Sequence, residues 1–139
     1  MTSAHELFRR LLNADGQSRS AKTVELFGWL ILIEGSAALF FPHASAALLR
    51  LPPRVEQASH YVRLVGLLVS GLGMLYIVCG RVNAEGFVFA SMLDRPLVPF
   101  AMAVLWYLDI LPAPLALLFS IQDFGSFVWT YLTWCSERQ

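Results

Sequence analysis

Long apolar stretches are the feature that most limits what this chain can fold into. A helix that crosses a membrane needs about 20 mostly apolar residues. The sequence has four stretches of this kind, at residues 24–41, 61–80, 97–111 and 113–134. Only 14% of the residues are Asp, Glu, Lys or Arg, whereas a soluble domain carries roughly 25%. The sequence therefore predicts an all-α fold, a single integral-membrane domain over residues 1–139 built as a four-helix bundle.

The charge balance and the motif content exclude several classes of function. Ten Lys and Arg residues cancel ten Asp and Glu residues, so the chain lacks the basic stripe of a nucleic-acid-binding protein. Cys79 and Cys135 lack the spacing of metal ligands, and no nucleotide-binding or zinc-protease motif occurs. His43 and His60 flank the first outer loop and leave a metal site as a minor alternative. We predict no nucleic-acid partner, no cofactor and no metal.

The third apolar stretch is short, so the residues before it need an interpretation of their own. Residues 86–93 are also apolar, but Asp94, Arg95 and Pro96 separate them from the stretch that follows. We interpret residues 86–93 as an interfacial segment. Residues 111–113 leave room only for a tight turn, so the third and fourth spans are predicted to be antiparallel neighbours.

The distribution of basic residues predicts the orientation in the membrane. An N-terminus inside places seven Lys and Arg residues on the inner side: Arg9, Arg10, Arg19, Lys22, Arg81, Arg95 and Arg138. The outer side then has three: Arg50, Arg54 and Arg63. Because basic residues favour the cytoplasmic side, we expect a multi-pass protein of the cell (inner) membrane with both termini in the cytoplasm.

Residues 3–16 are predicted to form a short helix on the inner membrane surface. Ser3 and Glu6 have the spacing of a capping box, and the apolar residues that follow form one face of a helix. An alternative interprets the first apolar stretch as a secretory signal, cleaved at Ala44-Ser45-Ala46. That stretch is longer than the apolar part of a signal and contains Glu34, so the membrane helix is favoured.

Two acids lie deep inside predicted spans and are candidate catalytic residues. Glu34 and Asp123 fall about 10 to 12 Å from the outer ends of their spans, at about 1.5 Å per residue. Two carboxyl groups close together in hydrocarbon cannot both stay ionised, and a shared proton suits general acid/base catalysis. In the alternative, each acid is neutral and hydrogen-bonds a neighbouring helix. Polar residues at helical spacing on the fourth span are expected to bind substrate in the same cavity: Ser120, Ser126 and Thr130.

Two further features of the spans point to packing. Arg63 and Asp109 fall at matching depths, each two residues inside the outer end of its span, and are predicted to form a structural ion pair. Gly66, Ser70 and Gly73 lie on one face of the second span, where another helix backbone can approach closely. That helix belongs either to the same bundle or to a second copy in a homo-oligomer.

Three segments resemble a known group of proteins. They are RLVGLLVSGLGMLY in the second span, DRPLVPFAMAVLW in the third and SIQDFGSFVWTYL in the fourth. Over about residues 24–134 the chain resembles small four-helix bacterial membrane proteins of the DoxX-like kind, through Arg63, Gly66, Tyr76, Arg95 and Asp123. The resemblance implies a four-helix bundle, and some members of that group are accessory subunits of quinone-linked oxidoreductases. Tyr76 joins the residues expected to bind substrate.

Two classes of function follow from these features. In the first, the bundle encloses a polar pocket for a lipophilic small molecule or lipid, and Glu34 with Asp123 moves protons in an isomerisation, an epoxide opening or a hydration. In the second, the protein is a non-catalytic scaffold or an accessory subunit of a membrane complex. A polar stripe facing an acid on another span exceeds what packing requires, so the first class is favoured.

Overall fold

The computed structural model describes residues 3–14, 16–49 and 56–139, and this part of the chain forms helices and no strand. The helices are α1 (Ala4–Asn13), α2 (Arg19–Phe40), α3 (Pro42–Leu48), α4 (Glu56–Arg81), α5 (Glu85–Asp94), α6 (Leu97–Tyr107) and α7 (Ala113–Glu137). Four helical segments are long and apolar enough to cross a membrane: α2, Ala58–Arg81 within α4, Glu85–Tyr107 across α5 and α6, and α7. The predicted all-α architecture with four membrane-long segments is therefore confirmed.

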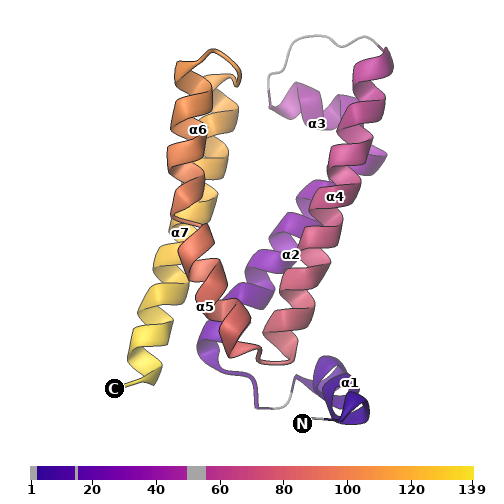
Figure 1. Cartoon of the computed structure of the whole chain (residues 1–139). Helices are drawn as coiled ribbons and strands as arrows, with labels where there is room; N and C mark the ends of the chain where they lie inside the picture. The colour runs from indigo at the N-terminus through magenta and orange to yellow at the C-terminus, as the bar shows by residue number, and fades with distance from the viewer. Residues whose placement is uncertain (1–2, 15, 50–55) are drawn as a thin grey trace.

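The four long segments form two pairs that spread apart like the arms of a V (Figure 1). In one pair α2 lies along α4, and in the other α6 lies along α7. The pairs come together at the end where α5 lies, which we call the closed end; at the other, open end lie α3 and the turn between α6 and α7. The antiparallel arrangement predicted for the third and fourth spans is confirmed by the pairing of α6 with α7.

Glycines bring the backbones of α2 and α4 into direct contact. A Cβ atom added at Gly73 of α4 would lie 2.5 Å from the backbone nitrogen of Leu32 and 2.8 Å from the carbonyl oxygen of Gly28. A Cβ atom added at Gly66 would lie 2.5 Å from the backbone nitrogen of Leu39. The small-residue face predicted on the second span is thus the seam between α2 and α4 of one chain. Of the two alternatives for this face, the packing of α2 supports a helix of the same bundle, and a homo-oligomer stays a prediction.

The third span begins earlier than predicted. Residues 86–93, expected as an interfacial segment, belong to α5, which buries three side chains in the protein and leads into α6. The helix breaks between them at Pro96, which has no N–H group to donate to the preceding turn. Arg95 therefore lies in the middle of the segment Glu85–Tyr107 and not at its inner end.

The start of α2 and the end of α7 are tied together at the closed end. The Ser18 hydroxyl caps α2 by accepting a hydrogen bond from the backbone N–H of Ala21 at 3.1 Å. The Glu137 carboxylate of α7 adds a second cap, because it accepts from the backbone N–H groups of Arg19 and Ser20. A carboxylate in this position also interacts favourably with the helix dipole.

The buried apolar core includes Ala21, Val24, Phe27, Ile31, Tyr76, Val88 and Met92.

The N-terminal helix α1 has the amphipathic character predicted for it. The Ser3 hydroxyl accepts from the backbone N–H of Glu6 at 3.3 Å, which is half of the predicted capping box. The Glu6 carboxylate does not complete the box, because Arg10 and Arg9 donate to it, and these hydrogen bonds lower the pKa of Glu6. The large apolar side chains that α1 exposes are Leu7, Phe8 and Leu12.

The seam between α2 and α4 generates a prediction on stability. Gly73→Ala places a methyl group against the α2 backbone, so the helices must separate, and we expect a loss of about 1–3 kcal/mol in the free energy of unfolding. Gly71→Ala is the matched control on the same helix, because no atom lies within 4 Å of a Cβ added there. It should be neutral or stabilising by about 0.5–1 kcal/mol. Denaturant unfolding in detergent measures both, and equal effects at the two positions would contradict the seam.

Candidate functional site

A groove opens between the two helix pairs toward the open end. It has a volume of about 420 Å³ and is lined by side chains from α2, α3, α4 and α7. Most of the lining is apolar, and it includes Ala38, Val62, Val65, Leu115, Leu118 and Phe119. Among the described residues that line it, only Glu34 of α2 has an ionisable carboxyl group. The groove therefore combines an apolar wall with one carboxyl group.

The Glu34 carboxyl is held from one side only. Gln122 of α7 donates a hydrogen bond from Nε2 to Glu34 Oε2 at 3.0 Å, which links the two arms of the V. Within the described residues Glu34 Oε1 accepts no hydrogen bond. Because Glu34 is only partly buried and lines the groove, this second oxygen is the one left for a ligand.

Asp123, the predicted partner of Glu34, takes a different position. It interacts electrostatically with both Glu34 and Arg95, but it does not line the groove, and nor does Ser120. In the described part of the chain no hydrogen bond joins the two acids, because the amide of Gln122 occupies the Glu34 side chain. The expectation that both acids line one cavity is therefore wrong for this groove, while their catalytic role stays a prediction.

Arg95 is the largest of the fully buried side chains in the described part of the chain, with 1% of its surface exposed. Its Nη1 donates to the hydroxyl of Thr130 at 3.0 Å and to the carbonyl oxygen of Ser126 at 3.3 Å. Its Cζ lies 4.1 Å from the ring centre of Phe27 and 5.3 Å from that of Tyr76. Arg95 thus contacts Ser126, Thr130 and Tyr76, three of the residues that were expected to bind substrate. Nε and Nη2 are buried and have no hydrogen-bond partner among the described residues.

Hydroxyl groups continue the polar contacts from Arg95 to the closed end. Thr130 and Thr23 place their hydroxyl oxygens 2.8 Å apart, across the contact between α7 and α2. Thr23 also donates to the carbonyl oxygen of Ser20 at 2.7 Å, and the Ser20 hydroxyl donates to Glu137 at 2.6 Å. Hydrogen bonds of this kind hold helices together inside a membrane. This row is therefore a second connection between the two arms of the V, beside the contact of Gln122 with Glu34.

The predicted ion pair between Arg63 and Asp109 does not form. Both side chains are exposed, and the salt bridges within the described residues join Glu6 to Arg9 and Arg10 and Glu25 to Arg81. Arg63 lies on α4 and Asp109 follows α6, and these helices belong to different arms (Figure 1). Matching depth was not enough, because the arms diverge toward the open end.

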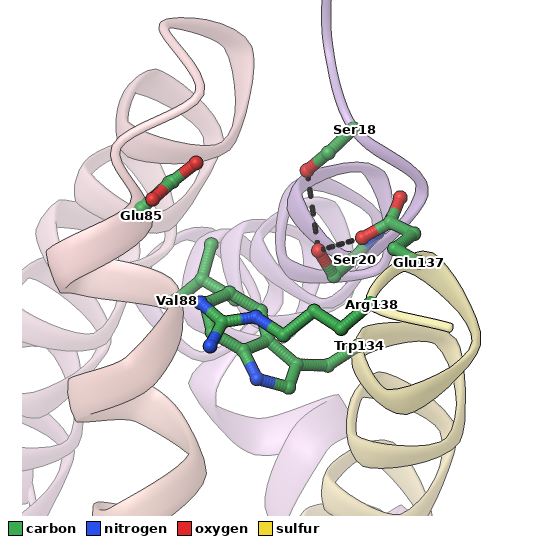
Figure 2. Close-up of a pocket in the computed structure, with 7 residues that line it drawn as sticks. All are labelled: Ser18, Ser20, Glu85, Val88, Trp134, Glu137 and Arg138. Carbon is green, nitrogen blue, oxygen red and sulfur yellow. Dashed lines mark hydrogen bonds between the residues drawn. The ribbon is translucent and has the colours of Figure 1, made fainter.

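A second, polar recess of about 320 Å³ lies at the closed end (Figure 2). Its walls carry Ser18, Ser20, Glu85, Val88, Trp134, Glu137 and Arg138. The Arg138 guanidinium lies over the Trp134 ring, with Cζ 4.1 Å from the ring centre. Glu137 is engaged with the start of α2. The described residues contain no group of three or more His, Cys, Asp or Glu side chains placed to hold a metal ion.

Sequence reasoning missed Arg95 as an interior residue, although a signal was present. The third span was predicted to begin at residue 97, which placed Arg95 at the inner membrane surface. A count over Glu85–Tyr107 as one span puts Arg95 near its centre. A charged residue at that depth is a candidate functional residue.

The burial of Arg95 leads to a prediction about the relative stability of two variants at this position. Arg95→Met keeps an apolar contact with Phe27 and removes a buried charge. Arg95→Lys keeps the charge but loses the planar guanidinium, which stacks on Phe27 and donates hydrogen bonds from its edge. No ion-pair partner lies within 4.0 Å of Arg95 in the described chain. We therefore expect the Lys variant to be the less stable of the two by about 1–3 kcal/mol.

Unfolding of both variants in one detergent measures this order, and Arg63→Met serves as the control because Arg63 is exposed and unpaired in the described structure. That control should unfold like the unaltered protein. A Met variant less stable than the Lys variant would show that the positive charge is required, with Asp123 as its counter-ion.

No known protein family, characterised protein or solved structure matches this chain. The resemblance to the DoxX-like proteins therefore stays a prediction.

Proposed function

We propose that this chain is a multi-pass membrane protein that binds a lipophilic small molecule or lipid in the groove between its two helix pairs. One observation carries the proposal: a groove of about 420 Å³ with an apolar wall and a single carboxyl group. Small-molecule sites typically have about 300–1,000 Å³ and an apolar lining with few polar groups. The volume and the lining of this groove both fall within that description.

The cost of Glu34 in an apolar environment supports a role in binding. A carboxyl group deep in a membrane is unfavourable by about 2.5–3.5 kcal/mol on insertion scales. Packing alone is satisfied elsewhere, by the glycine seam between α2 and α4 and by the hydroxyl contacts between α2 and α7. A ligand that pairs with Glu34 would give this carboxyl group a function in binding, beyond its contact with Gln122.

Catalysis by this site stays within the proposal as a more specific form of it. Glu34 with Asp123 would then transfer protons in an isomerisation, an epoxide opening or a hydration. The groove favours binding over catalysis, because Asp123 is not part of its lining. General acid/base catalysis needs each group within hydrogen-bond reach of the substrate or of a bridging water.

A second candidate function is that of a scaffold or accessory subunit in a membrane complex. The observation in its favour concerns α6, which has no buried residue and contacts only α5 and α7 within the described structure. A helix with this much free surface can pack against a helix of another membrane protein. Loss of groove binding with retention of a protein partner would favour this function.

We further propose that the closed end faces the cytoplasm of a cell (inner) membrane. With Arg95 inside a span, six basic residues remain toward the closed end: Arg9, Arg10, Arg19, Lys22, Arg81 and Arg138. Three belong to the other end by sequence position: Arg50, Arg54 and Arg63. The bias of basic residues toward the cytoplasm supports this orientation.

Orientation is tested with a single cysteine at the start of α4. In a chain with Cys79 and Cys135 replaced by Ser, Glu56→Cys should react with an impermeant maleimide added to intact cells. A cysteine at Arg138 should react only after the membrane is opened. The reverse pattern of labelling would place both termini outside.

Groove binding is tested by photolabelling in native membranes. A neutral dodecanol carrying a diazirine should label the protein saturably, and excess dodecanol should compete. Val65→Trp fills the groove and should remove most of this labelling. Val78→Trp is the matched control, because Val78 lies on the same helix and does not line the groove. Labelling that is not saturable, or that survives in Val65→Trp, would contradict the proposed function.

A further inference from the structure

The lining of the groove contains one acidic side chain and no basic one among the described residues. Glu34 is that acidic residue. Asp123, the next acid inward, interacts electrostatically with Glu34 and adds to the negative potential. A carboxyl in hydrocarbon is stabilised by an opposite charge at close range. The chemistry of the groove therefore selects a ligand by its charge as well as by its apolar surface.

Arg95, the buried basic residue of the described structure, does not supply a positive charge at the groove wall. It is enclosed between the rings of Phe27 and Tyr76 and is bonded to Thr130. It is not among the residues that line the groove. Its charge acts on Asp123, and Glu34 Oε1 accepts no hydrogen bond within the described residues. A cationic ligand would complement Glu34 there.

We propose that the natural ligand of the groove is a lipophilic amine, bound as its ammonium form against Glu34. This inference rests on the proposed function and names the chemical class of the molecule bound. The ammonium group donates to Glu34 Oε1, the oxygen that has no partner in the described structure, while Gln122 keeps Oε2 in place. A charge-assisted hydrogen bond of this kind is roughly twice as strong as a neutral one.

The remaining walls of the groove suit such a ligand. Its apolar residues from α4 and α7 accommodate a hydrocarbon chain. The Phe119 ring also lines it and lies one turn along α7 from Gln122, the residue that holds Glu34, and an aromatic face attracts a cation. A carboxylate ligand would be repelled by Glu34, and an alcohol would leave the carboxyl without an opposite charge. Of the three head groups, the ammonium is favoured by each interaction on this wall.

The experiment compares three competitors with the same chain and different charge. Dodecylamine, dodecanol and dodecanoate compete against the diazirine-dodecanol in native membranes at pH 7, each corrected for its partition into protein-free liposomes. We expect dodecylamine to compete best in the unaltered protein. Glu34→Gln keeps the hydrogen bond with Gln122 and removes the charge, so the preference for the amine over the alcohol should fall by about tenfold or more.

Asp109→Asn is the matched control for a general attraction of cations to acids at the open end. Asp109 is exposed there and does not line the groove, so its removal should leave the preference unchanged. Thermal unfolding of both variants checks folding, and the unaltered protein alone still tests the proposal through its ranking of the three competitors.

Each outcome separates this inference from the proposed function. Saturable labelling with equal competition by amine and alcohol, or a Glu34→Gln variant that keeps the amine preference, would overturn the amine and leave the lipophilic site standing. Dodecanoate as the best competitor would overturn it as well and point to Arg95 as the binding group. Labelling that none of the three reduces would remove the groove as a binding site altogether.

Discussion

The backbone contact between α2 and α4 is the constraint on which the rest of the architecture depends. Glycines on both helices bring the two backbones into contact there, and Phe27 of α2 packs against Tyr76 of α4 beside them. The opposite side of α2 remains free to contact α5 and α7. α2 is therefore the helix that both arms share, and the polar residues along it decide where the second arm is attached. A looser seam would move α2 and with it every other contact.

Polar side chains between α2 and α7 change their role with distance from the closed end. Near that end the hydroxyls of Thr23 and Thr130 satisfy one another, and Arg95 joins them. Further along, the contact between Gln122 and Glu34 satisfies only one oxygen of the acid. The contact between these two helices thus has both hydroxyl groups hydrogen-bonded at one level and a carboxyl group with only one bonded oxygen at the next. That carboxyl group is the one that faces an apolar groove.

Local patterns in the sequence were enough to predict the four spans, the small-residue seam and the cap on α1. Each depends on residues a few positions apart. The ion pair of Arg63 with Asp109 failed because depth in the membrane does not say which helices are neighbours. Asp123 directly follows Gln122 in the chain, so its side chain points in a direction about 100° further around the helix axis. That rotation depends on how α7 packs, so the sequence flagged Glu34 but named the residue beside its true partner.

The α6–α7 arm is joined to α2 by hydrogen bonds at the closed end and again at Gln122, so the part of α7 before Gln122 is its freest part in the described structure. α7 has 25 residues, which corresponds to a length of about 37 Å. The free part from Ala113 to Gln122 is about 14 Å long, at about 1.5 Å per residue. A small change in its angle would alter the width of the groove at the open end without any repacking of the glycine seam. If the groove binds a ligand as proposed, the lipid around this free part of α7 would then influence affinity alongside the groove residues.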